Sequence, residues 1–342
     1  MSTTPTAAGR PTLEQVAARA GVGRGTASRV INGSPKVSAH ARRAVEEAVA
    51  ELGYVPNAAA RALVRRRTDT VALVIAESEE RVFGEPFFAG IVRGIGAALA
   101  EADRQLVLLL AQHPERRQAL EGFLTRQHVD GVLLLSLHDD DHLLARLREH
   151  GVPVVVGGRP SEGVTAGWVD VDNAQGAALA VGHLLAAGRH RIATIAGPAD
   201  MVAGRARFQG YVEALTAAGQ ALDERLVERG DFGQASGAVA MAALLRSAPD
   251  LDAVFCADDL MAVGALQALR AAGRRVPEDV AVVGFEDAPV ARSTSPALTT
   301  VRQSADQMGR EMVAMLLETM ASAGRDLPGR MLPTRLVVRD SA

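Results

Sequence analysis

Short apolar runs alternate with amphipathic stretches over most of the chain, and this alternation limits the fold more than any other feature. The apolar runs are Val71–Ala76, Leu106–Ala111, Gly131–Ser136, Val154–Gly157, Ile192–Gly197, Ala253–Ala257 and Val280–Phe285. The stretches with helical periodicity are Phe87–Glu101, Arg116–Arg126, Leu143–His150, Ala174–Ala187, Arg205–Ala218, Gln234–Arg246 and Leu260–Ala271. Strands that are apolar along their whole length are typical of parallel sheets covered on both faces. There are too many for one nucleotide-binding unit, so we expect an α/β fold with two consecutive lobes.

A separate helical segment precedes this alternation. Apolar residues at helical spacing predict a first helix over Leu13–Ala20, and Thr12 with Gln15 three residues later has the pattern of a capping box. Gly21 ends that helix, and a second helix is predicted over Arg24–Ile31 before Asn32-Gly33. A third helix is predicted over Ala39–Leu52, with Gly53 as its cap.

Two short helices, a glycine turn and an exposed polar second helix are the parts of a helix-turn-helix. The major groove of B-DNA admits one α-helix, and its base edges offer donors and acceptors. Arg29 is suited to a bidentate contact with guanine, and Thr26 and Ser28 are short donors for phosphates or nearby bases. The same local pattern also fits an ordinary helical hairpin within a larger core.

The charge of the chain is distributed unevenly. Residues 10–67 hold 11 Arg and Lys against 4 Glu, a charge of +7, so the remainder carries −10 within a total of −3. A basic segment attached to an acidic body is the electrostatic pattern of a DNA-binding protein.

Other features bear on location and on chemistry. Residues 1–9 have neither the basic nor the apolar region of a signal peptide, and we see no apolar run of membrane-spanning length, so we expect a cytoplasmic protein with no membrane partner. Cys256 lies in an apolar run and is expected in the core. His138 and His142 flank Asp139–Asp141 with the spacing of a metal pair, but these acids more often begin a surface helix. Gly90, Gly94 and Gly96 fall inside a helix and do not form a phosphate-binding fingerprint. We therefore expect no enzyme, no metal site and no cofactor.

Residues 12–68 resemble the DNA-binding head of the LacI/GalR family of repressors. The matching words are TLEQVA, AGV, TASRVING, VSAHARRAVEEAVAELGYVPN and ARAL. The resemblance implies a tail over residues 1–10, a helix-turn-helix domain over 11–56, and a hinge helix and linker over 57–68. It implies that Leu63 enters the minor groove when the hinge folds on DNA; Leu63 as an ordinary apolar linker residue is the alternative. The residues expected to contact DNA are Thr12, Arg24, Gly25, Thr26, Ser28, Arg29, Asn32, Lys36, Asn57, Arg61 and Leu63.

The head departs from the family pattern before and within the second helix. Gly23 stands where the family commonly has Ser, and the pair Arg24-Gly25 occupies the positions that carry much of the operator choice. Gly25 has no side chain to read a base, and glycine in a helix costs about 1 kcal/mol relative to Ala. Close approach of the backbone to DNA is a physical reason for a glycine there.

The resemblance continues in the body through GRHRIATIAGP (188–198), ADDLMAVGAL (257–266) and VPEDVAVVGFED (276–287). It implies the fold of periplasmic binding proteins, in which the chain crosses three times between two lobes. The implied effector-binding and dimerisation domain spans 69–342, with lobe 1 at about 69–170 and 304–331 and lobe 2 at about 171–303 and 332–342. The last helix, at about Ser304–Ala321, would return to lobe 1, and Thr334–Arg339 would close lobe 2.

Such a fold binds a small molecule at the carboxyl ends of its strands. The candidate effector-binding residues, taken from these positions and from the resemblance, are Phe87, Phe88, Arg159, Arg207, Phe232, Asp258, Asp259, Glu286, Asp287 and Gln303. Each also has a structural alternative: Asp258 as a helix cap, Phe88 as a core residue, Arg207 as an ion-pair partner. The family usually has Asp where Glu286 stands. Carboxylates and arginines beside an aromatic face suit a sugar.

Several segments are most similar to cellobiose-responsive repressors of the family, among them EPFFAGIVRGI (85–95), QHVDGVLLLSLH (127–138) and IATIAGPADMVAG (192–204). The resemblance implies a homodimer that binds a pseudo-palindromic operator and is released by cellobiose or a related β-glucoside. Another sugar, or a purine-type corepressor, is the alternative on the same scaffold. A secreted solute-binding protein would share the body but would lack residues 11–68.

Overall fold

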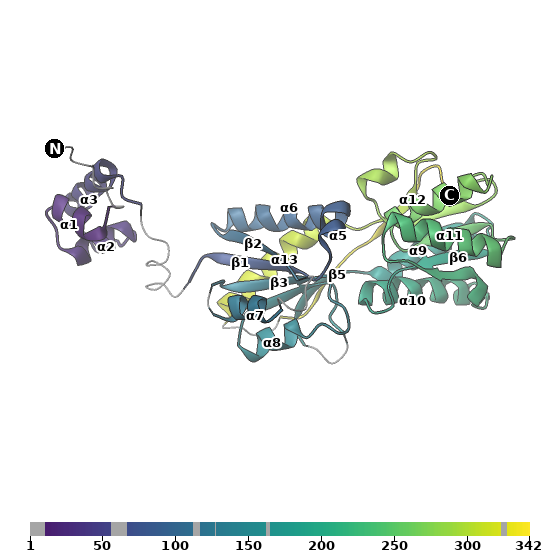
Figure 1. Cartoon of the computed structure of the whole chain (residues 1–342), viewed down its shortest axis with the longest axis horizontal. Helices are drawn as coiled ribbons and strands as arrows, with labels where there is room; N and C mark the ends of the chain where they lie inside the picture. Colours follow the sequence, from purple (N-terminus) through teal and green to yellow (C-terminus); the bar gives the residue numbers. More distant parts are fainter. Residues whose placement is uncertain (1–10, 56–66, 112–116, 127, 162–164, 323–326) are drawn as a thin grey trace, which may run out of the picture. The chain divides into compact units, whose positions relative to one another are not determined.

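The chain divides into two compact units, Met1–Thr68 and Asp69–Ala342, which we call the head and the body. The computed structural model describes residues 11–55, 67–111, 117–126, 128–161, 165–322 and 327–342. Figure 1 labels most of their helices and several of their strands. Each helix of the described part is too short or too polar to cross a membrane.

The head contains three helices, α1 (Leu13–Arg19), α2 (Arg24–Ile31) and α3 (Ala39–Leu52). The predicted capping box is present, because Thr12 Oγ1 accepts from the backbone N of Gln15 while the Gln15 side chain accepts from the backbone N of Thr12. Helix α3 ends at Gly53, whose φ of +60° is easily adopted only by glycine. The head core consists of Val16, Ala17, Ala27, Val30, Val45 and Ala48. The three predicted helices are thus confirmed to within a residue.

Lobe 1 of the body is a parallel sheet in the order β11-β5-β4-β3-β1-β2. Its strands are β1 (Thr70–Ile75), β2 (Gln105–Leu110), β3 (Gly131–Leu135), β4 (Val154–Gly157), β5 (Gly167–Val171) and β11 (Arg330–Leu332). Helices α6 (Pro86–Glu101) and α13 (Ala305–Ala321) cover one face, and α7 (Arg117–Thr125) and α8 (Leu143–Glu149) lie on the other (Figure 1). A short helix, α5 (Glu79–Gly84), precedes α6.

Two glycines of α6, Gly90 and Gly94, serve helix packing. A Cβ atom on Gly94 would lie 2.1 Å from the backbone oxygen of Asp306, and one on Gly90 would lie 2.8 Å from Ala305 Cβ. Both neighbours belong to α13, so these glycines allow the two helices to approach closely.

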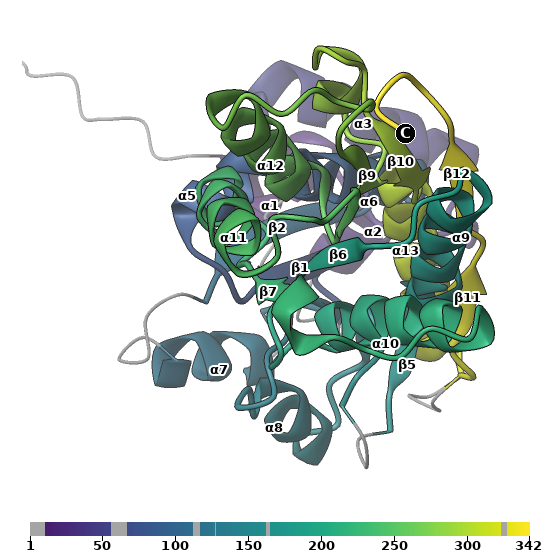
Figure 2. The same ribbon diagram turned by 90° about the vertical axis from the view of Figure 1, so that its right-hand side faces the viewer.

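Lobe 2 is a sheet in the order β12-β10-β9-β8-β6-β7, in which only the β10–β12 pair is antiparallel. Its strands are β6 (Ile192–Ala196), β7 (Val227–Arg229), β8 (Ala253–Cys256), β9 (Ala281–Glu286), β10 (Thr299–Arg302) and β12 (Arg335–Val337). Its helices are α9 (Asn173–Ala186), α10 (Val202–Ala217), α11 (Gln234–Ser247) and α12 (Asp259–Ala271), with 3-10 turns η2 (Glu224–Leu226) and η3 (Pro289–Arg292). Helices α11 and α12 lie on one side of the sheet and α9 and α10 on the other (Figure 2).

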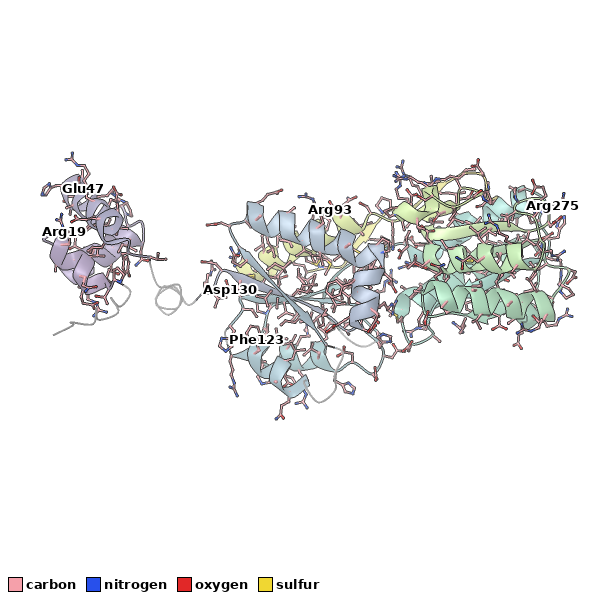
Figure 3. All side chains as sticks on the ribbon, turned by 45° about the horizontal axis from the view of Figure 1, so that its top comes forward. Arg19, Glu47, Arg93, Phe123, Asp130 and Arg275 are labelled. Carbon is pink, nitrogen blue, oxygen red and sulfur yellow. The ribbon has the colours of Figure 1, made fainter. Side chains whose placement is uncertain are left out.

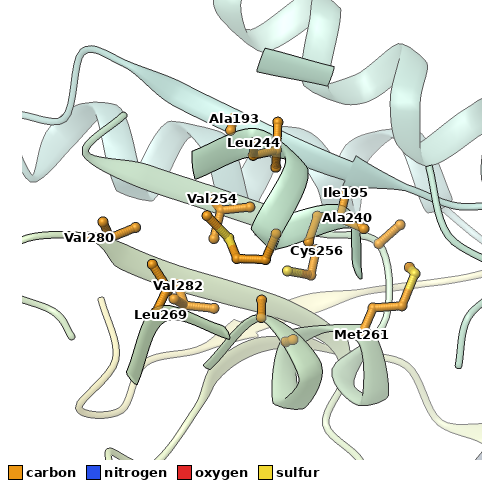
Figure 4. Close-up of a cluster of buried hydrophobic side chains, with 14 of the residues drawn as sticks. Ala193, Ile195, Ala240, Leu244, Val254, Cys256, Met261, Leu269, Val280 and Val282 are labelled. Carbon is orange, nitrogen blue, oxygen red and sulfur yellow. The ribbon is translucent and has the colours of Figure 1, made fainter. Parts of the chain in front are cut away.

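The two faces of each sheet carry separate apolar clusters. Cys256 is buried between the lobe 2 sheet and α11 and α12, near Ile195, Ala240 and Met261 (Figure 4), which confirms its predicted place in the core. Charged side chains such as Arg93 and Arg275 extend from the surface (Figure 3).

The chain passes between the lobes after β5, after β10 and after β11. Five of the described strands lie outside the predicted apolar runs, namely β5, β7, β10, β11 and β12, and of these β12 was expected from the resemblance as the segment Thr334–Arg339. Strand β7 is a short, half-exposed edge, and β10 contains the buried but polar Thr299 and Thr300, so neither forms an apolar run.

Candidate functional site

Helix α2 presents the polar surface predicted to meet DNA. Arg24, Gly25 and Arg29 are exposed, while Ala27 and Val30 face the core of the head. Of the other candidates, Thr12 and Lys36 are exposed, and Thr26, Ser28 and Asn32 are half-buried. Asn57, Arg61 and Leu63 lie outside the described residues. The described candidates come from α2 and from the segments that flank α1 and α3.

The arginines of α2 have weak partners within the head. Arg24 Nε lies 3.0 Å from Glu14 Oε1, and both side chains are more than half exposed. Arg29 Nε donates to the backbone oxygen of Gly25 at 3.1 Å. Because an exposed ion pair contributes only about 0–1 kcal/mol, a phosphate or a base edge can replace these partners at small cost.

Packing within the head does not require glycine at position 25. The nearest atom to a Cβ added at Gly25 is Arg29 Nη2 at 3.9 Å, an ordinary contact distance. Glycine at this position therefore lowers the stability of α2, and the packing of the head does not explain its presence.

A cavity opens between the lobes of the body, with about 570 Å³ of empty space including the part open to solvent. Lobe 1 contributes Arg81, Glu85, Phe87, Phe88, Leu135, Ser136, Gly157, Gly158, Asp170 and Met308. Lobe 2 contributes Asn173, Met201, Ala203, Arg207, Phe232, Glu286 and Gln303.

Many of these residues stand where strands end. Ser136 follows β3, Gly157 ends β4, Glu286 ends β9 and Gln303 follows β10. Phe232, Ser136 and Glu286 have φ values of 69°, 61° and 116°, a region that side-chain-bearing residues rarely adopt. Such conformations concentrate at ligand sites, where the surrounding fold holds them in place.

Arg207 is the buried centre of the lobe 2 wall. Its guanidinium donates to Asn173 Oδ1 at 2.8 Å, to the Ala257 carbonyl at 2.6 Å and to Gln303 Oε1 at 3.3 Å. It also lies 3.8 Å from the centroid of the Phe285 ring, so cation–π attraction adds to these bonds. Burial lowers the pKa of Arg207, although four surrounding carboxylates oppose that shift. The guanidinium is thereby fixed in one orientation.

Buried carboxylates surround this arginine. Gln303 Nε2 donates to Glu286 Oε1 at 2.9 Å, and Asn173 Nδ2 donates to Asp170 Oδ1 at 3.1 Å. Burial raises the pKa of Glu286 well above its usual range and also raises the pKa of Asp170. A polar ligand that donates hydrogen bonds would find acceptors here that already lie away from water.

Arg81 and Glu85 add a charged pair from lobe 1. Arg81 Nε donates to Glu85 Oε1 at 2.5 Å, and the guanidinium lies 5.3 Å from the centroid of the Phe232 ring of lobe 2. Burial raises the pKa of Glu85 to about 7, although the charge of Arg81 acts in the opposite direction. This contact places an aromatic ring between arginines of both lobes, since Arg207 also lies 5.7 Å from its centroid.

The structure brings six predicted residues together in the cavity wall: Phe87, Phe88, Arg207, Phe232, Glu286 and Gln303. The side chains of the other four are engaged elsewhere. Asp258 Oδ1 accepts from the backbone N of Met261 and caps α12, and Asp259 accepts from Thr300 Oγ1 at 2.5 Å and from Ala288 N at 2.7 Å.

Asp287 and Arg159 complete this group. Asp287 accepts from Arg302 Nε at 2.5 Å and pairs with Arg339, with its side chain only 1% exposed. The Arg159 guanidinium lies 5.0 Å from the centroid of the Trp168 ring. These partners are structural, and the effector role predicted for the four residues has no support from their contacts.

Sequence reasoning did not identify several residues of the cavity wall, among them Arg81, Glu85, Ser136, Asp170, Asn173, Met201 and Met308. Asp170 and Asn173 lie at or close to the predicted boundary between the lobes at residues 170 and 171, and this position could have identified them. Arg81 and Glu85 lie on or beside a short helix whose sequence gives no sign of a ligand.

Two family models match the chain. The one described as bacterial regulatory proteins, lacI family, matches residues 12–57, and the one described as a periplasmic binding protein-like domain matches residues 181–342. The HTH-type transcriptional regulator CelR of Thermobifida fusca is 56% identical over 97% of this chain and 98% of that protein. The HTH-type transcriptional repressor CytR of Escherichia coli (strain K12) is 32% identical over 96% of each.

Solved structures agree with these matches. A transcriptional regulator CelR–cellobiose complex is 54% identical, with a TM-score of 0.78 over 97% of this chain and 100% of that chain. The lac repressor dimer bound to operator and the anti-inducer ONPF is 30% identical, with a TM-score of 0.85 over 97% of this chain and 99% of that chain. With a helical head, a two-lobed body and relatives that match both along almost their entire length, this chain belongs to the lacI family of bacterial regulatory proteins.

Proposed function

We propose that this protein is a transcriptional repressor that leaves its operator when cellobiose or a related β-glucoside binds between the lobes of the body. The observation that carries the proposal is the cavity in which Arg207, Glu286 and Gln303 lie beside the Phe232 ring. Fixed hydrogen-bonding groups beside an aromatic face suit a saccharide, whose hydroxyls bond and whose C–H face packs on the ring. A relative 54% identical to this chain is described in complex with cellobiose.

The proposed effector contacts come from both lobes. They are the predicted Phe87, Phe88, Arg207, Phe232, Glu286 and Gln303, joined by Arg81, Glu85, Asp170 and Asn173. A ligand that bonds to both walls stabilises one arrangement of the lobes over others. It therefore changes operator affinity through a coupling free energy, typically about 1–3 kcal/mol.

The operator side of the proposal rests on the exposed face of α2 and on the positions predicted from the resemblance. A homodimer places two such helices on a pseudo-palindromic site, and the lac repressor relative is described as a dimer bound to operator. The role follows that of relatives described as transcriptional regulators, so we propose a cytoplasmic regulator and not an enzyme.

The test is operator binding measured by fluorescence anisotropy at moderate salt, with a palindromic probe and a scrambled probe, with and without cellobiose. We expect tight binding to the palindrome alone and its release by the sugar. Selective operator binding that does not change with cellobiose would contradict the sugar assignment and still support a repressor. Binding that appears only when a purine base is added would replace the inducer by a corepressor.

A further inference from the structure

A second set of contacts joins the lobes outside the cavity wall. His138 and Asp139 follow β3 in lobe 1, and Asp200 and Arg205 lie at and after the turn between β6 and α10 in lobe 2. His138 Nδ1 lies 2.7 Å from Asp200 Oδ2, and Arg205 donates to both Asp139 carboxylate oxygens at 2.7 and 3.1 Å. The backbone N of Asp139 donates to the Asp200 carbonyl at 3.1 Å. We call these four residues the clasp.

Glu77 connects the clasp to the cavity wall. Its Oε1 lies 3.4 Å from His138 Nε2 and accepts from Ser136 Oγ at 2.5 Å and from Arg81 Nη1 at 2.6 Å. Ser136 and Arg81 both line the cavity. A change in the hydrogen bonds of His138 therefore alters Glu77, and through Glu77 it affects Ser136 and Arg81, which line the cavity.

Carboxylates outnumber cations around His138. The charged groups of the neighbouring segments are Glu77 after β1, Arg81 on α5, Asp139, Asp140 and Asp141 after β3, and Asp200 and Arg205 of lobe 2. Burial lowers the pKa of His138, but the bond to Asp200 and the charge of Glu77 outweigh it and raise the pKa above its usual value. Only the imidazolium donates from both ring nitrogens, so only the protonated form serves Asp200 and Glu77 together.

We propose that the clasp positions the two cavity walls for the effector, and that protonated His138 joins them by bridging Glu77 of lobe 1 and Asp200 of lobe 2. The proposal rests on the proposed function, because it assigns the clasp to the same cavity. When the lobes separate, His138 loses Asp200, so the joined form binds the proton more tightly. By linkage, protonation favours the joined form, fully below the pKa of the open form, and the advantage disappears as the pH rises through the pKa of the joined form.

The first experiment is calorimetric titration with cellobiose between about pH 5.5 and about pH 8.5, where histidine changes charge. We compare the unaltered protein with His138→Asn, Asp200→Asn and the matched control His142→Asn, which changes a histidine that precedes α8 within lobe 1. His138 and Asp200 have 26% and 56% of their side chains exposed, so these variants are expected to fold.

The unaltered protein and His142→Asn are expected to bind cellobiose on the order of 3- to 10-fold more tightly at the acid end of this range. Binding is also expected to take up protons, which is measured by repeating the titration in buffers with different ionisation enthalpies. His138→Asn and Asp200→Asn are expected to lose this increment. The acids of the cavity wall are the same in every variant, so their effect on cellobiose affinity is common to all. The difference in pH dependence between the variants therefore reports on His138 and Asp200. An unchanged pH profile in His138→Asn would overturn the proposal.

A second measurement needs no ligand and separates the two proposals. The imidazole of His138 is titrated by NMR in the unaltered protein and in Asp200→Asn, with the resonance assigned by its loss in His138→Asn. We expect Asp200→Asn to lower the pKa of His138. An unchanged titration would overturn the clasp whether or not cellobiose binds, whereas a failure of cellobiose to bind beside a normal shift would overturn only the sugar assignment.

Discussion

Two adjacent acids, Glu286 and Asp287, are predicted to have different roles, Glu286 in ligand binding and Asp287 in the stability of the body. Glu286 lines the cavity, whereas Asp287 joins Arg302 of β10 to Arg339, which follows β12. We expect Asp287→Asn to destabilise the body and leave cellobiose affinity unchanged. We expect Glu286→Gln to change cellobiose affinity and leave stability nearly unchanged, because the amide oxygen of Gln can still accept from Gln303.

The cost of Asp287→Asn follows from its contacts. Hydrogen bonds to charged groups contribute about 1.5–3 kcal/mol each, and removing one partner of a buried ion pair costs about 3–5 kcal/mol. The side chains of Arg302 and Arg339 are 35% and 14% exposed, so both are partly rehydrated after the substitution. Asn also keeps one acceptor oxygen, and we therefore expect a loss of about 2–3 kcal/mol.

The assay is thermal unfolding of each variant together with calorimetric titration with cellobiose. A loss of this size lowers the melting temperature of a domain this large by roughly 4–10 °C. For Glu286→Gln we expect cellobiose to bind on the order of 3- to 10-fold more weakly, the value of about one neutral hydrogen bond, because burial raises the pKa of Glu286 and favours its uncharged form. An Asp287→Asn variant with normal melting and weakened cellobiose binding would refute the structural assignment.

Four further outcomes are expected. Gly25→Ala should stabilise α2 by about 1 kcal/mol in thermal unfolding of the head and weaken operator binding in the anisotropy assay; tighter binding would exclude close backbone approach as the reason for glycine. Leu63→Ala should weaken operator binding without changing the melting temperature of the body, and unchanged binding would exclude the insertion of Leu63 into the minor groove. Phe232→Leu should weaken cellobiose binding on the order of tenfold by calorimetry and leave DNA binding intact. Burial raises the pKa of Glu85 to about 7, so its charging costs folded-state stability as the pH rises; urea unfolding should show this loss, about 1–2 kcal/mol between about pH 5 and 8, reduced in Glu85→Gln.

The elements of the body were predictable where burial alone decides them. Strands such as β3 and β8 are buried on both faces, so their sequences are continuous apolar runs. Strand β10 is equally buried but contains Thr299 and Thr300, and Thr300 Oγ1 donates to Asp259 in the core. A hydroxyl that finds its partner 41 residues away along the chain is invisible to local hydropathy.

The cavity wall was predictable only in part for a similar reason. The position of a residue after a strand predicts that it lies near the cleft, and this located Glu286, whereas Gln303 was predicted from the family resemblance because β10 lies outside the predicted apolar runs. Arg81 lies on a short helix outside this pattern, and it meets Phe232 only because the fold brings lobe 1 against lobe 2. Contacts between lobes depend on residues far apart in sequence, so periodicity carries no information about them.

The pair Glu286-Asp287 shows that the position of a residue at the end of a strand does not determine where its side chain points. Both follow β9, yet consecutive φ values of 116° and 55° turn the chain so that only the first carboxylate faces the cavity. Such values are costly for residues with side chains, so tertiary contacts must hold them. Arg302 and Arg339 supply those contacts for Asp287, because each is partly buried and pairs with its carboxylate. The direction of Asp287 is therefore set by arginines 15 and 52 residues later, whereas the Glu286 carboxyl group, which faces the cavity, is held separately by the bond from Gln303 Nε2.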